Sequence, residues 1–334
     1  MLSKKIIKKL LVATAMVFGL SFVVSSNTMA ATPYAKHGQL SVKGSKIIDK
    51  KGRTFQLKGV STHGLAWFPD YVNKKAFKTL HNKWKANIVR LAMYTEEYNG
   101  YLSGGNKAEL EQLIDKGVKA ADSLGMYSII DWHILSDGNP NTHKGEAKEF
   151  FEKMSKKYAD DPRVLYEICN EPNGGTSWSD IKSYAEEIIP VIRKNAPKAI
   201  IIVGTPTWSQ EVDKPASDPI KGYDNIMYTL HFYAATHKDD LRNKAEAAIK
   251  SGLPIFISEF SICDASGNGG IDYSSAKAWK KFINQYKLPY VAWNLSNKNE
   301  SSALIKDNVK SLSGWKKSQL SATGKWISKM MQGK

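Results

Sequence analysis

Cysteines and long apolar runs are both scarce in this chain of 334 residues. Cys169 and Cys263 are its two cysteines, too few for the disulfide framework that small exported domains use. Each lies in an apolar stretch, so we expect two buried free thiols, with a Cys169–Cys263 bridge as the alternative. The apolar run near the N-terminus has about fifteen residues, whereas a membrane-spanning helix needs about twenty.

That apolar run belongs to a pattern typical of an export signal. The basic stretch MLSKKIIKK precedes the apolar stretch LLVATAMVFGLSFVV, and NTMA offers small residues for cleavage after Ala30. We therefore expect residues 1–30 to be a signal peptide and the protein to be secreted and extracellular. We expect residues 31–334 to form one domain, a monomer without a membrane partner once the signal is removed.

Several motifs of cofactor and nucleophile chemistry are also missing. The chain has no G-x-S-x-G, the signature of a serine nucleophile, and no H-x-H or H-E-x-x-H, the spacings typical of zinc sites. The glycine-rich segment DASGNGG, residues 264–270, lacks the spacing of a phosphate loop. We therefore expect no metal and no cofactor.

Acidic residues are outnumbered by basic ones, 32 against 48, which gives a formal charge of +16. A strongly basic chain can indicate a nucleic-acid partner. Here the lysines are spread over expected helices and interleaved with acidic residues, as in HKDDLRNKAEAAIK, and no nucleic-acid motif accompanies them. The pattern favours a solvated basic surface and no nucleic-acid partner, and it leaves adhesion to anionic surfaces open.

Strand and helix signals alternate regularly along the chain. Before them, residues 39–60 alternate and turn at two Lys-Gly pairs, which predicts a small N-terminal hairpin leading into the first strand. Expected strands cover 54–60, 87–93, 126–132, 164–169, 199–203, 226–232, 254–260 and 289–294. Expected helices cover 74–84, 107–124, 145–158, 179–195, 239–251, 273–286 and 319–331, with a short helix at best in 209–222.

Eight short apolar strands indicate a parallel sheet that is buried on both faces and covered by helices. Eight strands of this kind match an α/β fold, the closed (β/α)8 TIM barrel. An open doubly wound sheet is the alternative. It would need a glycine-rich phosphate turn after the first strand, and GVSTHGL is not one.

Polar and aromatic residues recur where the expected strands end. The functional face of such a barrel is formed by the carboxyl ends of its strands. We therefore expect one site built from His63, Trp67, Arg90, Tyr94, Trp132, His133, Asn170, Glu171, Trp208, His231, Tyr233, Glu259, Trp293, Lys298 and Glu300.

Glu171 and Glu259 are the centre of that expected site, because strands four and seven can face each other across a barrel mouth. A pair of carboxyl groups can hydrolyse a glycosidic bond: one protonates the leaving oxygen, and the other attacks the anomeric carbon or activates water. The pKa values of the two must differ. We expect Arg90 to lower the pKa of Glu259, which makes Glu259 the nucleophile and Glu171 the acid. The alternative is that both glutamates form structural ion pairs.

The aromatic residues suggest what binds, because the C–H faces of sugar rings stack on indole. We expect Trp67, Trp208 and Trp293 to contact a sugar. The orientation of Trp132 stays open. His63, His133 and His231 come from separate strands without a metal-binding pattern, which favours hydrogen bonds to substrate or to the glutamates. The remaining tryptophans are expected to pack in the core or on the surface: Trp84, Trp178, Trp279, Trp315 and Trp326.

Taken together, these motifs resemble glycoside hydrolase family 5. The segments that carry the resemblance are YEICNEPNG, PIFISEF, VSTHGL, VRLAMY, IIDWHILSDGNPN, LHFYAATH and AWNLSNKNESSAL, between about Lys36 and Trp326. Several barrel glycosidases share the Asn-Glu-Pro signature, but its combination with HFYAATH and WNLSNKNE is more specific. The sequence is most similar to secreted bacterial endo-1,4-β-glucanases, or cellulases, of the bacillus and clostridium type.

The resemblance implies a retaining hydrolase that needs no cofactor. It makes Glu171 the acid/base and Glu259 the nucleophile, supported by Arg90 and Asn170. It also places His133, His231 and Tyr233 around the cleavage point, and His63, Trp67, Trp208, Trp293, Lys298 and Glu300 along a glucan cleft. One departure is Ser261, where the family often has glycine; serine adopts positive φ reluctantly, so the path of the chain there stays open.

The expected activity is the hydrolysis of internal β-1,4-glucosidic bonds of cellulose with retention of configuration. Retention predicts a carboxyl separation of about 5–5.5 Å. The nearest alternatives keep the mechanism and change the sugar: a mannanase, a lichenase or a xyloglucanase. A non-catalytic glycan-binding protein on the same barrel and a metal-dependent hydrolase are alternatives from other classes.

Overall fold

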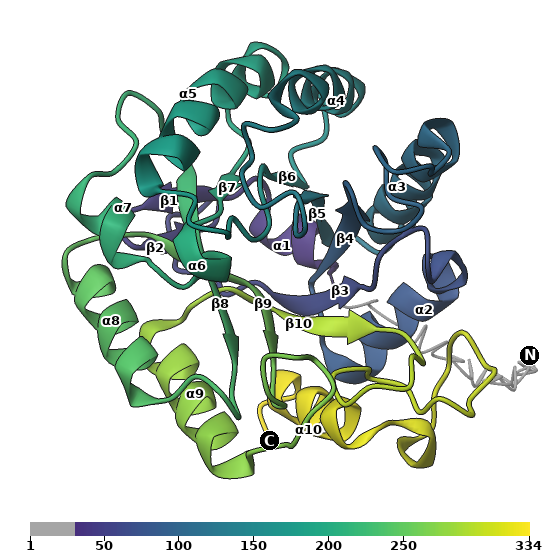
Figure 1. Ribbon diagram of the computed structural model, residues 1–334. Helices are drawn as coiled ribbons and strands as arrows, with labels where there is room; N and C mark the ends of the chain where they lie inside the picture. The colour runs from purple at the N-terminus through teal and green to yellow at the C-terminus, as the bar shows by residue number, and fades with distance from the viewer. Residues whose placement is uncertain (1–30) are drawn as a thin grey trace, which may run out of the picture. The chain divides into compact units, whose positions relative to one another are not determined.

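The computed structural model describes residues 31–334, so the expected signal peptide lies outside the described part of the chain. Residues Thr32–Lys334 form a closed barrel with the strand order β10-β3-β4-β5-β6-β7-β8-β9 (Figure 1). All neighbouring strands in the barrel are parallel. The expected TIM barrel is confirmed, and the open sheet is excluded. None of the described helices is long and apolar enough to span a bilayer.

Each expected strand is present in the barrel, although the first begins later than expected. Thr54 forms only an isolated bridge with Ile48, and the strand itself starts at Lys58. Ser261 continues the strand that contains Glu259, without positive φ, so its replacement of glycine does not redirect the chain there. The barrel strands are β3 (Lys58–Thr62), β4 (Ile88–Tyr94), β5 (Tyr127–His133), β6 (Val164–Glu167), β7 (Ile201–Val203), β8 (Ile226–Tyr233), β9 (Ile255–Ser261) and β10 (Tyr290–Leu295).

The expected helices surround the barrel (Figure 1). The segment 74–84 is an α-helix followed by a π-helical turn, Leu80–Trp84, and 209–222 contains only one short helix after Ser209. Two short helices were not expected, Pro33–His37 and Pro206–Ser209, although the capping Thr32 and the initial Pro33 of the first are typical helix-start signals. The α-helices are α1 (Pro33–His37), α2 (Lys74–Thr79), α3 (Lys107–Asp122), α4 (Lys144–Lys157), α5 (Trp178–Asn195), α6 (Pro206–Ser209), α7 (Asp213–Ser217), α8 (Asp239–Lys250), α9 (Tyr273–Tyr286) and α10 (Ala322–Met331).

The N-terminal hairpin is present as expected, formed by the antiparallel strands β1 (Ser41–Lys43) and β2 (Lys46–Ile48). Leu40 and Ile47, from this segment, join an apolar cluster with inward side chains of the barrel strands. The strand residues of that cluster are Ile88, Tyr127, Ile129, Leu165, Ile202, Met227, Phe256 and Val291. The cluster fills one end of the barrel interior, so polar groups at the other end sit on an apolar base.

Alternation along each strand decides which side chains point into the barrel. On β5, Ile129 belongs to the apolar cluster in the interior, and Asp131 and His133 follow it at every second position. Trp132 faces the opposite way and packs against Phe150 of α4, with ring centroids 5.1 Å apart. This settles the orientation of Trp132: it lies between the sheet and the helices and does not face a ligand.

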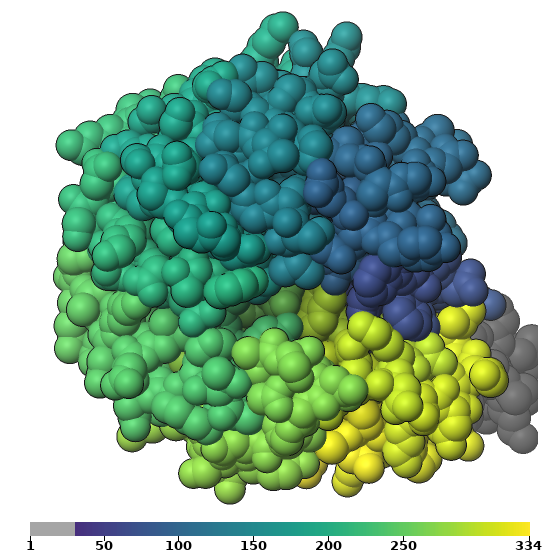
Figure 2. Space-filling model, viewed as in Figure 1, coloured from purple at the N-terminus to yellow at the C-terminus, as the bar shows by residue number. Residues whose placement is uncertain are grey.

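The face drawn in Figure 2 has no channel open through its centre, and apolar side chains of the strands pack in the barrel interior. The interior of a TIM barrel is a packed core and not a pore. Cys169 and Cys263 are buried free thiols, as expected. Among the tryptophans expected to pack, Trp279 and Trp315 are almost completely buried.

Candidate active site

A cavity of about 590 Å³ lies at the carboxyl ends of the barrel strands. Most of the site residues predicted from the sequence line this cavity. Arg90 and Asn170 are fully buried beside it, and Trp132 faces away from it. The predicted residues in its lining are His63, Trp67, Tyr94, His133, Glu171, Trp208, His231, Tyr233, Glu259, Trp293, Lys298 and Glu300. Side chains from distant parts of the sequence are therefore gathered at one face of the barrel.

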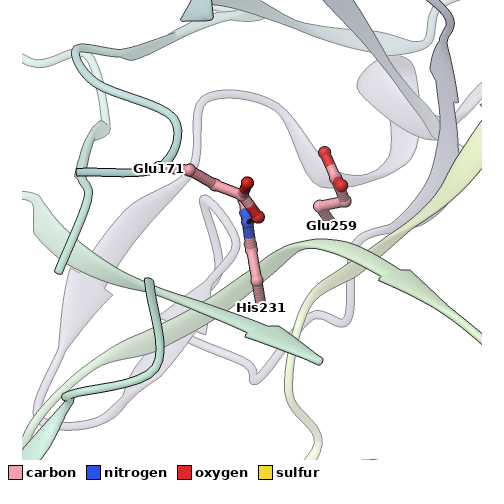
Figure 3. Close-up of side chains that lie close together, drawn as sticks. All are labelled: Glu171, His231 and Glu259. Carbon is pink, nitrogen blue, oxygen red and sulfur yellow. Dashed lines mark hydrogen bonds and ion pairs between the residues drawn. The ribbon is translucent and has the colours of Figure 1, made fainter. Parts of the chain in front are cut away.

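Glu171 and Glu259 reach this cavity from strands that are separated by two others in the barrel. Glu171 lies in the loop just after β6, and Glu259 lies within β9. In Figure 3, Glu171 and His231 point toward one another and the carboxylate of Glu259 lies to one side. One carboxylate oxygen of each glutamate and one ring nitrogen of His231 lie within 4.8 Å of one another. An oxygen–oxygen approach within this limit is compatible with the 5–5.5 Å between carboxyl groups of retaining glycosidases and argues against the 6.5–9.5 Å of inverting ones.

Arg90, on β4, is the fully buried cation of the site. Its Nε and Nη2 donate to the two carboxylate oxygens of Glu167 at 2.7 and 3.2 Å. Nη2 also donates to Oδ1 of Asn170 at 2.6 Å and pairs with Asp131 at 3.0 Å, while Nη1 donates to Oε2 of Glu259 at 3.2 Å. Burial alone would lower the pKa of Arg90, but the three carboxylates outweigh it and raise that pKa. Arg90 therefore remains charged.

Both carboxylate oxygens of Glu259 accept hydrogen bonds: Oε1 from Tyr233 Oη at 2.7 Å, and Oε2 from Arg90 at 3.2 Å. Burial raises the pKa of Glu259 and the nearby Glu171 raises it further, while His231 and Arg90 oppose the rise. Arg90 contacts Glu259 as expected, but the expectation that the pKa of Glu259 is lowered is wrong. The pKa is raised overall, because the loss of hydration on burial outweighs the ion pair with Arg90. The two donors favour the ionised form of this carboxyl.

Glu171 has no such donors, and its side chain is only 12% exposed. Burial raises the pKa of Glu171 to about 8, with Arg90 opposing the rise and Glu167 and Asp131 adding to it. Glu171 therefore carries a proton at neutral pH. Its Oε1 lies 2.8 Å from Nδ1 of His231, whose pKa burial lowers to about 4, so the imidazole beside it is neutral.

The hydrogen bonds around His231 define which ring nitrogen carries the proton. Glu167, paired with Arg90, accepts a hydrogen bond from Oγ of Ser258 at 2.6 Å. Because a hydroxyl has one hydrogen, the Ser258 oxygen must accept from Nε2 of His231, 3.0 Å away. Nδ1 then offers a lone pair and accepts a hydrogen bond from the protonated carboxyl group of Glu171. One chain of hydrogen bonds thus runs from the buried Arg90 to the Glu171 carboxyl.

A second histidine is held by a second buried carboxyl group. Nδ1 of His133 lies 2.6 Å from Oδ2 of Asp131, two positions earlier on β5. Burial lowers the pKa of His133 well below its usual value, so this ring is neutral too. It stacks on Trp293 at 5.3 Å between ring centroids, and both residues line the cavity. The ring orientation of His133 is therefore determined by Asp131 on one side and by an aromatic face on the other.

Trp208 is the most exposed aromatic residue of the cavity, at 46%. It lies in α6, where Thr207, Trp208 and Ser209 all have positive φ, between 51° and 59°. Positive φ costs a non-glycine residue about 1–2 kcal/mol. Trp208 N donates to the carbonyl oxygen of Pro172 at 2.9 Å, and Ser209 Oγ to that of Asn170 at 2.7 Å. These bonds hold the strained turn against the loop of Glu171.

Another wall of the cavity combines charged and aromatic groups. Nζ of Lys298 lies 2.7 Å from Oε2 of Glu300 and 5.5 Å from the ring centre of Trp67. His63 stacks on Trp67 with centroids 5.2 Å apart. Burial would raise the pKa of Glu300, but hydrogen bonds from Lys298, Ser302 and Asn294 outweigh it and lower that pKa. This wall therefore offers an ionised carboxylate beside an indole face.

Glu171, His231 and Glu259 are also the one group in residues 31–334 with the spacing of metal ligands. The chemistry of the donors does not favour a metal. Both nitrogens of His231 are already engaged, with Glu171 and with Ser258, and both oxygens of Glu259 accept hydrogen bonds. Binding a cation here would break those hydrogen bonds and displace the proton of Glu171. The expected absence of a metal stays a prediction.

Sequence reasoning missed three buried polar residues of the site: Asp131, Glu167 and Ser258. Two of these residues could have been found from the pattern of side chains along their strands. Asp131 shares the inward face of its strand with His133, two positions on. Glu167 is the one charged residue of the apolar strand β6, and a charge inside a buried strand requires a partner. No comparable signal marks Ser258, since serine is common in strands of every kind.

A TIM barrel with two converging carboxyl groups at its strand ends defines a class, the barrel glycoside hydrolases. The family model for cellulase, glycosyl hydrolase family 5, matches residues 48–299, and the chain belongs to this family. An endoglucanase of Clostridium saccharobutylicum is 46% identical over 322 residues, 96% of this chain and 71% of that protein.

Solved structures agree with this assignment. The structure of the cellulase Cel5C_n superimposes with a TM-score of 0.86 at 43% identity, covering 91% of this chain and 94% of that one. The catalytic domain of the Thermobifida fusca endoglucanase Cel5A has a TM-score of 0.86 at 36% identity, with 90% and 100% covered. A variant of that domain has been solved in complex with cellotetraose.

Proposed function

We propose that this protein is a retaining endo-β-1,4-glucanase in which Glu259 is the nucleophile and Glu171 the acid/base. The observation that supports these assignments most directly is the difference between the two carboxyl groups. Glu259 accepts hydrogen bonds from Arg90 and Tyr233, which favour its anion, whereas burial raises the pKa of Glu171 to about 8. A retaining glycosidase needs one ionised and one protonated carboxyl group at this separation.

In the first step, a carboxylate oxygen of Glu259 attacks the anomeric carbon while the glycosidic C–O bond breaks. The proton of Glu171 leaves its hydrogen bond to Nδ1 of His231 and passes to the departing oxygen, so the leaving chain ends in a hydroxyl group. Glu259 is then an ester of the remaining sugar, and Glu171 is a carboxylate. Tyr233 and Arg90, which bonded the charged carboxylate, keep its oxygens aligned during this attack.

In the second step, Glu171 acts as a base and takes a proton from a water molecule. The water oxygen attacks the anomeric carbon, the ester bond to Glu259 breaks, and the configuration at that carbon is retained overall. His231 supports both steps. Because Ser258 holds the proton on Nε2, the lone pair of Nδ1 faces Glu171 and orients its carboxyl group.

The substrate proposal is a β-1,4-glucan chain. The exposed Trp208 and the Trp67–His63 pair offer aromatic faces to sugar rings, and Glu300 and Lys298 offer partners to hydroxyl groups. The endoglucanase names of the relatives and the cellotetraose complex of the Thermobifida fusca domain support glucan over mannan or xylan. Secretion, with removal of residues 1–30, remains part of the proposal, and N-terminal sequencing of the exported protein tests it.

The test combines two variants with a panel of polysaccharides. We expect Glu171→Gln and Glu259→Gln each to lower the release of reducing ends from soluble cellulose by at least about a hundredfold. Exposed Glu149→Gln is the matched control and should retain full activity. Near-normal activity of either site variant would refute the assignment. Faster release from mannan or xylan than from β-glucan would refute the substrate.

A further inference from the structure

A second cavity, of about 250 Å³, lies away from the proposed active site and carries a strong positive charge. Five lysines line it, together with Trp84, Trp315, Leu320, Ser328 and Gln332, and no acidic side chain does. The lysines are Lys83, Lys317, Lys325, Lys329 and Lys334. We call this set the basic cavity. It is built from α10, the segment before it, and the π-helical turn that packs on α10.

The charge of this cavity is concentrated and does not follow the average composition of the chain. The last 34 residues, 301–334, contain seven lysines against one acidic residue, Asp307. A tenth of the sequence thus supplies six of the 16 net positive charges of the chain. Along α10, Lys325 and Lys329 are four positions apart and so lie on the same face of the helix.

In the described part of the chain, acidic side chains do not neutralise the lysines of the basic cavity. Within residues 31–334, none of the five forms an ion pair with a carboxylate. By contrast, lysines such as Lys119, Lys182 and Lys244 are paired with acids. Like charges that gather without counter-charges destabilise a fold unless something outside supplies the opposite sign. The basic cavity therefore presents unpaired cations to an external anion.

The chemistry of the lining restricts which anion fits. Trp84 and Trp315 are each only 2% exposed, so neither offers a face on which a nucleobase or a neutral sugar could stack. The lining has no arginine, the residue best suited to bidentate phosphate recognition. Lysine ammonium groups are compact point charges on flexible stems, so each can pair with one anionic group along a polymer without requiring a fixed geometry. The basic cavity thus recognises a ligand by its negative charge, and neither by aromatic stacking nor by bidentate hydrogen bonds.

We propose that the basic cavity binds an acidic polysaccharide, one that carries uronate carboxylates along its chain. The protein proposed above cleaves a neutral polysaccharide. A contact with an acidic polymer mixed with that substrate would hold the enzyme near it and raise the effective concentration of the glucan. The proposal goes beyond the glucanase activity and also accounts for the basic charge that the activity itself does not require.

The experiment measures binding of polygalacturonate to the protein by retardation in an affinity gel, at low salt and at about 0.15 M salt. The test variant is K317E/K325E/K329E. The matched control is K43E/K116E/K221E, which changes the net charge equally at exposed lysines outside the basic cavity. We expect the test variant to lose at least about tenfold in affinity, because each charge contact contributes to binding of a polyanion. The control should stay within about twofold of the native protein.

Activity is measured in parallel on a neutral cello-oligosaccharide, and both triple variants should match the native enzyme. The inactive Glu259→Gln variant should still bind polygalacturonate, which separates this proposal from the proposed catalytic function. Equal losses in the test and control variants would overturn the proposal by showing dependence on net charge alone. Tighter binding of duplex DNA than of polygalacturonate through the same three lysines would overturn it in favour of a nucleic-acid partner. Matching melting temperatures exclude misfolding as the cause of any loss.

Discussion

Nδ1 of His231 and Oε1 of Glu171 lie 2.8 Å apart, and this contact couples the proposed acid to a charge buried on the far side of the site. Beyond His231, the chain of hydrogen bonds passes through Ser258 and Glu167 to Arg90. The imidazole is neutral, so the contact orients the proton of Glu171 and does not remove it. Burial keeps the acid protonated, and this chain of hydrogen bonds orients its carboxyl group.

The pH dependence of activity follows from the two carboxyl groups. The active form has Glu171 protonated and Glu259 ionised. Because burial raises the pKa of Glu171 to about 8, we expect kcat/KM to fall as the pH rises through about 8. Because the pKa of Glu259 is also raised, the acidic decline should begin above the usual range of glutamate. A pH profile on a neutral cello-oligosaccharide checks both limits, and a basic limit below pH 6 would contradict the first.

Stability should respond to the same proton. Between the ordinary pKa of glutamate, about 4.5, and about 8, the folded protein binds a proton at Glu171 that the unfolded chain has lost. The contribution of Glu171 to the free energy of unfolding therefore falls as the pH rises through that window. Glu171→Gln removes this dependence. The melting temperature of this variant minus that of the native protein should therefore increase from pH 5 to pH 9. The exposed variant Glu149→Gln should show no such gain, and a constant difference for Glu171→Gln would disprove the raised pKa.

Ser258→Ala tests whether the chain of hydrogen bonds serves proton transfer. Without the hydroxyl, Nε2 of His231 loses its partner, and the proton can move to the nitrogen that faces Glu171. We expect kcat/KM to fall by about tenfold on substrates whose leaving group needs a proton. An aryl cellobioside with a weakly basic leaving group needs no such help and should be cleaved nearly as fast as by the native enzyme. Equal losses on the two substrates would mean that Ser258 has only a structural effect.

Trp208→Ala should weaken substrate binding while leaving the reacting carboxyl groups in place. Removing the exposed indole deletes an aromatic face on which the C–H face of a sugar ring can stack. We expect a rise in KM of about tenfold on long cello-oligosaccharides and a smaller change in kcat. Tyr273→Ala is the control, because Tyr273 is similarly exposed, at 48%, and does not line the cavity. The same loss in that control would show that the effect is not specific to the cleft.

Metal removal tests the alternative that the protein is a metal-dependent hydrolase. Glu171, His231 and Glu259 have the spacing of metal ligands, but the hydrogen bonds already described engage the same atoms. We expect dialysis against EDTA to leave activity on β-glucan unchanged. A loss of activity that added zinc or another divalent cation restores would replace the two-carboxylate mechanism with a metal-dependent one.

Much of this protein was predictable from its sequence, because the relevant signals are local. Apolar strands alternating with amphipathic helices predicted the barrel, and polar residues at the strand ends predicted its functional face. The boundaries that were missed lie where local signals are weak: residues 54–57 are β-prone yet pair only at an isolated bridge, and the short α1 depends on a cap at Thr32.

Only the tertiary structure decided which buried polar groups meet beneath the cavity. Asp131, Glu167 and Ser258 come from three strands, and they meet around Arg90 and His231 because the barrel closes with one register of its strands. The tertiary structure also decided that the pKa of Glu259 is raised and not lowered. A sequence shows that an arginine is present, but the free energy lost when a carboxylate leaves water depends on everything packed around it.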